Sequence, residues 1–247
     1  MPMKRIVFYL IFLLTCAGIG FVEAQTTSPA DALAHWKAGT VVTEENVRRA
    51  GEDRCFGVDT LSDDVFARMW GKSYTADCRI PRSQLRYVRT LHYDAEGRIL
   101  LGEMVCNRLI ASDVLDIFRE LYRQRYPIGR MVLIDNFDAD DERSMRQNNT
   151  CCFCYRTIAG SRHLSWHARG LAVDINTLYN PCVKRRADGT LFVQPSTARR
   201  YTDRTGRFPY KIVAGDLLYR LFTERGFVWG GHWKSTKDYQ HFEKHLP

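Results

Sequence analysis

The chain has 247 residues, of which 45% are hydrophobic and 26% charged, and its formal net charge is +8. This composition is typical of globular proteins and excludes the disordered, collagen-like and multi-span membrane classes. At about 150 residues per domain, the length predicts one or two domains. A core of that size folds without a metal or disulfide, so any metal site should first be considered functional.

Residues 1–24 have the features of a secretory signal peptide. Lys4 and Arg5 precede an uncharged run over residues 6–22, and small residues around Ala24 provide a cleavage site. A membrane anchor is the alternative, because the run approaches the shortest length of a spanning helix. The small residues at the exit favour cleavage, so we expect an exported protein that keeps no membrane span.

Export predicts disulfide bonds. The cysteines that follow the predicted signal peptide are Cys55, Cys78, Cys106, Cys151, Cys152, Cys154 and Cys182. Their odd number allows at most three bridges within the chain and leaves one free thiol. We expect one bridge between Cys78 and Cys106, which flank the same predicted hairpin. A zinc knot over residues 151–154 is disfavoured, because its cysteine spacing differs from that of zinc knuckles.

Residues 25–76 are expected to form an accessory N-terminal segment with two short helices. Thr43 is a predicted N-cap for a helix that stops at Gly51, and Ser62 is one for a helix that stops before Gly71. Acidic residues follow both caps, as is usual in a first helical turn.

The main domain is expected over residues 77–247. Alternating apolar and polar residues predict a β-hairpin from strands at 85–93 and 98–106. Apolar residues at helical spacing then predict an amphipathic helix with Ser112 as its N-cap, ending before Pro127.

A buried strand is expected next, over residues 131–136, and from Phe137 the chain turns polar and predicts a long loop. Together these elements indicate an α+β fold, with a twisted, mainly antiparallel sheet and helices flanking one side.

Polar side chains that suit catalysis gather in two segments. Alternation over residues 171–176 places Asp174 on a strand whose other face is core, and His167 lies on the loop entering that strand. Near the C-terminus, Asp238 and His241 are three residues apart.

Zinc hydrolases need three protein ligands, an open position for water, and a carboxylate that takes the water's proton. His167, Asp174 and His241 supply the ligands, and Asp238 supplies the carboxylate. Any one of them alone would more often be an ordinary surface or core residue. Their joint presence in two segments rich in glycine and aromatic residues favours a metal site.

These segments resemble a known family. The pattern Ser-x-His-x-x-Gly-x-Ala-x-Asp is formed by Ser165, His167, Gly170, Ala172 and Asp174. Trp-Gly-Gly-x-Trp follows at 229–233, and Asp-x-x-His-Phe-Glu at 238–243. The combination is similar to the zinc D-alanyl-D-alanine carboxypeptidase and L-alanyl-D-glutamate endopeptidase family. That family includes vancomycin-resistance-type D,D-peptidases and shares its fold with hedgehog-type proteins, which implies the same fold here.

The resemblance implies that Zn²⁺ is bound by His167, Asp174 and His241, and that Asp238 is the general base. The family also uses an arginine to hold the oxyanion. We assign this role first to Arg156.

Arg143 is the reserve for the oxyanion role and a candidate for substrate binding. Ser165 is expected to orient the loop or the substrate, and Trp233 to line the cleft.

The resemblance implies a zinc peptidase that cleaves stem peptides of bacterial peptidoglycan in the periplasm or cell envelope. It does not decide whether the enzyme is a D,D-carboxypeptidase or an L-Ala-D-Glu endopeptidase. The positive net charge fits anionic wall peptides, and no nucleic-acid-binding motif is present. The alternative is a catalytically inactive, zinc-containing module for wall binding or signalling, against which the carboxylate of Asp238 argues. A disulfide scaffold is a third hypothesis, and the oligomeric state stays open.

Overall fold

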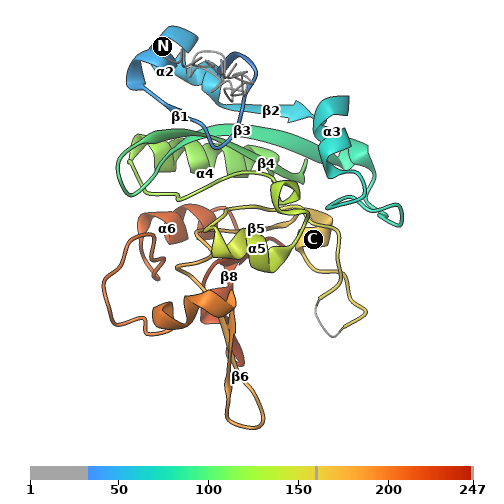
Figure 1. The fold of residues 1–247 in the computed structure, drawn as a ribbon, viewed down its shortest axis with the longest axis vertical. Coiled ribbons are helices and arrows are strands. Elements are labelled where there is room, and N and C mark those ends of the chain that lie inside the picture. Colours follow the sequence, from blue (N-terminus) through green and yellow to red (C-terminus); the bar gives the residue numbers. More distant parts are fainter. Residues whose placement is uncertain (1–32, 159–160, 246–247) are drawn as a thin grey trace, which may run out of the picture.

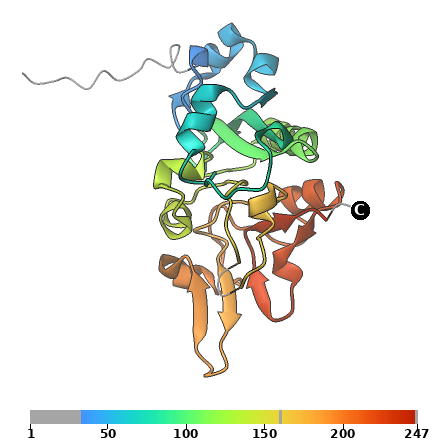
Figure 2. The same ribbon diagram turned by 90° about the vertical axis from the view of Figure 1, so that its right-hand side faces the viewer.

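The computed structural model describes residues 33–158 and 161–245, so the predicted signal peptide lies outside the described residues. Within these ranges, antiparallel sheets and short helices follow one another along the long axis of the molecule, from N-terminal elements at one end to a protruding hairpin at the other (Figures 1 and 2). The expected α+β class is confirmed. No helix in the described part of the chain is long and apolar enough to cross a membrane.

The first sheet is built around the predicted hairpin. Its four strands lie in the order β1 (Val41–Val42), β4 (Ile99–Asn107), β3 (Leu85–Tyr93) and β2 (Gly57–Thr60). The hairpin pairs from Leu85 opposite Asn107 to Tyr93 opposite Ile99. The carboxylate of Asp94 closes the turn by accepting hydrogen bonds from the backbone of Glu96 and Arg98. Both edge strands come from the N-terminal segment.

The two predicted N-terminal helices are confirmed as α2 (Glu44–Ala50) and α3 (Asp63–Met69). Thr43 caps α2 and Ser62 caps α3, each through its side-chain oxygen. On α3, Arg68 forms an ion pair with the buried Glu103 of β4. The N-terminal segment is therefore attached to the sheet by side chains as well as by strand pairing.

Helix α4 (Ala111–Arg123) lies between the first sheet and α6 (Leu217–Thr223) (Figure 1). It is the predicted amphipathic helix, but its N-cap is Ile110 and not Ser112, which is exposed. Most of the residues at helical spacing are buried in the largest core of the described residues. This core includes Val88, Met104, Val114, Phe118, Leu121, Val173, Phe222 and Phe242. The hairpin, α4 and the strand bearing Asp174 thus share one core.

The segment after this helix corrects the predicted strand at residues 131–136. Met131 to Ile134 are buried, yet they form no strand, and a 3₁₀ turn, η3 (Ile134–Phe137), begins among them. The side-chain amide of Asn149 bonds both the N–H and the C=O of Val132. A side chain here satisfies backbone groups that a neighbouring strand would otherwise satisfy.

The polar segment from Phe137 is also not one long loop. Helix α5 (Asp141–Arg146) forms within it, and the Asp140 carboxylate caps the helix by accepting the N–H of Arg143. The helix has six residues. A helix so short and polar has almost no hydrophobic periodicity, so its sequence resembles that of a loop.

Two smaller sheets complete the fold. The first has the order β5 (Ala172–Asp174), β10 (His241–Glu243) and β8 (Val228–Trp229). The second has the order β7 (Leu191–Gln194), β6 (Cys182–Arg185) and β9 (Thr236–Asp238), and its β6–β7 hairpin protrudes at the bottom of Figure 1. Short 3₁₀ turns are η1 (Glu52–Cys55), η2 (Arg82–Gln84), η4 (His167–Arg169), η5 (Ser196–Tyr201) and η6 (Gly230–His232).

The predicted disulfide is not formed. All seven cysteines in the described part of the chain are free thiols. Cys106 is fully buried in the core beneath α4, whereas Cys78 packs beside Ile80 in a separate cluster around α3. The two residues flank the same hairpin in sequence, but their side chains enter different cores, so the prediction of a Cys78–Cys106 bridge is wrong.

Candidate metal and catalytic site

The fold brings the three predicted metal ligands together from three elements. His167 begins η4, Asp174 ends β5, and His241 begins β10. His241 and Asp174 are direct partners in the antiparallel pairing of β10 with β5. The ligand atoms of all three residues lie within 4.8 Å of one another.

Asp174 is at the centre of this group. Its Oδ2 lies 3.1 Å from Nε2 of His167, and its Oδ1 lies 2.9 Å from Nδ1 of His241. Burial raises the pKa of Asp174, but the adjacent imidazoles of His167 and His241 outweigh burial and hold it well below its usual value. Two imidazoles and a carboxylate form a donor set of the kind that binds zinc in hydrolases, so these residues fit that ion.

A second layer of hydrogen bonds fixes the orientation of both imidazoles. Nδ1 of His167 donates to the carbonyl of Cys152 at 2.7 Å, which turns Nε2 toward Asp174. Nε2 of His241 donates to Glu243 at 3.0 Å, which turns Nδ1 toward Asp174. Metal-binding histidines usually make such contacts. The sequence motifs did not indicate this role of Glu243, although residues two apart on a strand share a face.

Asp238 lies beside this group with one carboxylate oxygen unpaired. Its Oδ1 is buried and has no hydrogen-bond partner among the described residues. Burial, followed by the negative charge of Asp174, raises the pKa of Asp238. A buried carboxylate that lacks a partner is suited to accept a proton from a bound reactant.

Gly230 allows this close arrangement. A Cβ atom at this position would lie 2.7 Å from the carbonyl oxygen of Asp238 and 3.3 Å from the Cβ of His241. The Trp-Gly-Gly pattern therefore has a steric reason: any side chain at the first glycine would displace the backbone that carries Asp238.

A cavity of about 280 Å³ opens onto the predicted site. Its lining includes His167, Asp174, His241, Asp238, Arg156, Ser165 and Trp233. Nε of Arg156 lies 2.6 Å from the Asp141 carboxylate, which holds the guanidinium at the cavity. Arg143 is not among the lining residues and instead pairs with Asp138 at 2.8 Å. Of the two arginines considered for the oxyanion, the fold brings Arg156 to the site.

The other two predicted residues contribute to the shape of the site. The hydroxyl of Ser165 accepts the N–H of Ala168 and so holds the turn that bears His167. The Trp233 ring lies 5.2 Å from the His241 ring, centroid to centroid, and forms part of the cavity wall.

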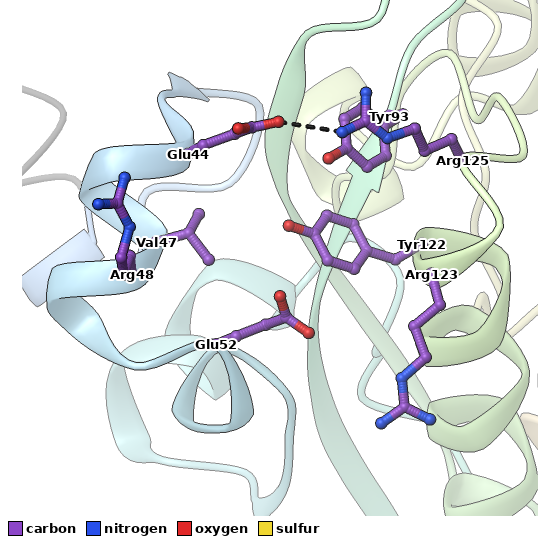
Figure 3. Close-up of a pocket in the computed structure, with 8 residues that line it drawn as sticks. All are labelled: Glu44, Val47, Arg48, Glu52, Tyr93, Tyr122, Arg123 and Arg125. Carbon is purple, nitrogen blue, oxygen red and sulfur yellow. Dashed lines mark hydrogen bonds and ion pairs between the residues drawn. The ribbon is translucent and has the colours of Figure 1, made fainter.

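A separate cavity of about 540 Å³ lies between α2 and α4 (Figure 3). Glu44 and Arg125 pair across it at 3.1 Å, and the rings of Tyr93 and Tyr122 stack at its base. Its lining residues include no histidine or cysteine, and Glu44 is already paired. The side chains suited to metal binding and proton transfer therefore line the cavity of about 280 Å³ and not this one.

Comparison with protein families gives a match to the C-terminal part of the chain. Residues 159–244 match a family model described as D-alanyl-D-alanine carboxypeptidase. The matched range contains the three grouped ligands and Asp238, and it ends just after the last motif. The family resemblance inferred from the sequence is thereby confirmed for this part of the chain, and it supports a peptidase. Comparisons with curated proteins and with solved structures return no match.

Proposed function

We propose that the protein is a zinc-dependent peptidase that cleaves D-amino-acid-containing stem peptides of bacterial peptidoglycan. One observation carries the proposal: a buried His-Asp-His group shares a cavity with the carboxylate of Asp238, one oxygen of which has no partner among the described residues. The family match over residues 159–244 supports the same chemistry. We further propose that the domain has the hedgehog and D,D-peptidase type of fold.

The roles of the residues follow from their positions. His167, Asp174 and His241 would hold the ion. When bound, zinc would lower the pKa of a water molecule and polarise the scissile carbonyl. Asp238 accepts the proton of the attacking water and returns it to the leaving amine. Arg156, held by Asp141, donates hydrogen bonds to the carbonyl oxygen as it gains negative charge.

Substrate and location are part of the proposal. Stem peptides carry free carboxylates, which suit a basic protein. The signal-peptide pattern of residues 1–24 would deliver the enzyme to the periplasm or cell envelope, where these peptides occur. Either a D,D-carboxypeptidase or an L-Ala-D-Glu endopeptidase is compatible with this site.

Metal analysis tests the ligand set. The variant His241→Ala should lose most of its bound zinc, because it removes one of three ligands. His232→Ala is a matched control, since His232 is exposed and lies outside the ligand group. Full zinc content in the His241→Ala protein would contradict the assignment.

Turnover tests the general base. The wild type and Asp238→Asn are incubated with muropeptides, with and without a chelator, and products are identified by mass. Asp238→Asn should keep its zinc but lose about 10²–10⁴-fold in kcat. Equal rates for the two proteins would refute the mechanism. Binding of wall fragments without cleavage by either protein would instead support the non-catalytic module.

A further inference from the structure

A second cavity adjoins the candidate active site and shares a residue with it. Its volume is about 760 Å³. We call it the arginine cavity, and its lining includes Arg79, Arg156, Arg162, Asp77, Tyr155 and Leu164. Arg156 lines both cavities, so the guanidinium proposed to face the scissile carbonyl also forms the boundary of the arginine cavity.

The charges of this cavity are not balanced. Arg156 is paired with Asp141, but Arg79 and Arg162 are exposed and have no ion-pair partner in residues 33–158 and 161–245. Asp77 is the one acidic residue in the lining. A concave surface with two unpaired guanidinium groups attracts an anion, and a planar carboxylate matches the fork of an arginine.

The walls of the cavity come from two distant parts of the sequence. Thr75, Asp77 and Arg79 follow α3, while the lining residues from Tyr155 to Thr157, with Arg162 and Leu164, precede the turn that bears His167 in the sequence. The backbone of Tyr155 bonds to Ser73, and Thr157 pairs with Leu164. The stretch that follows α3 and the stretch that precedes His167 thus form the cavity jointly.

We propose that the arginine cavity is a substrate subsite that binds a free carboxylate of an acidic peptide whose scissile amide lies at the metal residues. The inference rests on the proposed peptidase function and adds the substrate class: peptides with a carboxylate outside the cleaved bond. Arg79 and Arg162 bind this group, and Arg156 lies between the two sites.

Equilibrium binding tests the subsite separately from catalysis. Zinc-loaded Asp238→Asn protein is titrated calorimetrically with a soluble muropeptide, and with the same muropeptide after amidation of its free carboxylates. Arg79→Gln and Arg162→Gln, each added to this background, should weaken binding of the acidic peptide about fivefold, the equivalent of about 1 kcal/mol for an exposed charge pair. Binding of the amidated peptide should be weaker at the outset and insensitive to both substitutions.

Arg49→Gln is the matched control, because Arg49 is an exposed arginine on α2 and lines neither cavity. Equal affinity for the acidic and amidated peptides would overturn the subsite, as would arginine variants that bind like the control or a protein that binds neither peptide. If the wild type cleaves no peptide while binding still depends on Arg79 and Arg162, the proposed function fails and the subsite stands.

Discussion

His241 can offer either ring nitrogen to a metal, and its neighbours decide which one. Nε2 contacts Glu243 and Nδ1 lies 2.9 Å from Oδ1 of Asp174, so Nδ1 is the nitrogen on the side of the proposed metal site. Glu243 is itself buried and is contacted by His245, whose ring stacks on Trp166. Glu243 therefore sets the tautomer of a proposed ligand without touching the ion.

We expect Glu243→Gln to reduce zinc affinity about 10–100-fold, because the amide keeps the shape but loses the charge that polarises the imidazole. Competition with a chromogenic chelator measures the affinity. Glu224→Gln, at an exposed position after α6, is the control. Unchanged affinity in the Glu243→Gln protein would show that the contact with His241 does not influence the metal.

His92 links pH to stability. It is buried on β3, its Nδ1 donates to the carbonyl of Ile128 at 2.8 Å, and burial lowers its pKa to about 4. In the unfolded chain its pKa is about 6.5, so the unfolded state binds the proton first. Neutral His92 therefore favours the folded state fully above about pH 6.5, and this stabilisation is lost as the pH falls toward 4.

Between pH 7 and pH 4.5, protonation of His92 should therefore lower the unfolding free energy of the wild type by roughly 2–3 kcal/mol. His92→Asn removes the titrating group, so the variant should lose less stability over this range, whatever its stability at pH 7. Urea unfolding at both pH values gives the difference. His35→Asn, at an exposed histidine, should follow the wild type. A His92→Asn protein with the same pH dependence as the wild type would refute this account.

At the scale of elements, the turn η6 between β8 and β9 depends on the absence of a side chain at Gly230. A methyl group at Gly230 would collide with the backbone of Asp238 and crowd His241. Gly230→Ala should therefore destabilise the protein by about 1–3 kcal/mol, as overpacking does, and also weaken zinc binding.

Gly206→Ala provides the comparison, because nothing lies within 4 Å of a Cβ atom at Gly206. Thermal unfolding and metal content are measured for both variants. Wild-type values for Gly230→Ala would mean that the loop can move without cost to the site.

Elements with strong local signals were predictable from sequence. The first strand of the hairpin largely alternates apolar and polar residues and is followed by a turn sequence, and α2 and α3 carry side-chain caps. The site was predictable because its four residues occur in two motifs. Elements that depend on distant partners were not predictable. The side chain of Asn149 bonds the backbone of Val132 where a neighbouring strand was expected. The pairing of Arg156 with Asp141 requires helix α5, which the sequence did not indicate. The disulfide prediction failed because sequence proximity to a hairpin does not determine which core a side chain enters.

At the scale of the whole molecule, the predicted boundary between residues 76 and 77 separates parts that share cores. Apolar side chains of the N-terminal segment pack on the hairpin in two clusters. They include Val42, Val47, Cys55 and Phe56 in one, and Leu61, Val65 and Met69 in the other. Their partners on the hairpin, such as Leu91 and Leu101, are fully buried.

Polar contacts across the same boundary are also buried. Glu103 is 1% exposed in its side chain and is paired with Arg68. Asp135 accepts both the N–H and the hydroxyl of Ser73. Removing the N-terminal segment would leave both carboxylates without these partners in a low-dielectric interior. Breaking one buried pair alone costs about 3–5 kcal/mol.

We therefore expect a chain of residues 77–247 not to fold cooperatively, because it would lose both edge strands, two apolar clusters and these partners at once. Typical domains have only about 5–15 kcal/mol of stability in total. Circular dichroism during urea unfolding, compared with residues 25–247, gives the answer. A less drastic variant, Arg68→Met, should by itself lower the unfolding free energy by about 1–3 kcal/mol, because Glu103 is buried while Arg68 is partly exposed to solvent. Arg48→Met, which breaks an exposed pair with Glu45, should change it by less than about 1 kcal/mol. A cooperative transition in residues 77–247 would show that the peptidase domain is independent and that the N-terminal segment is only an addition to it.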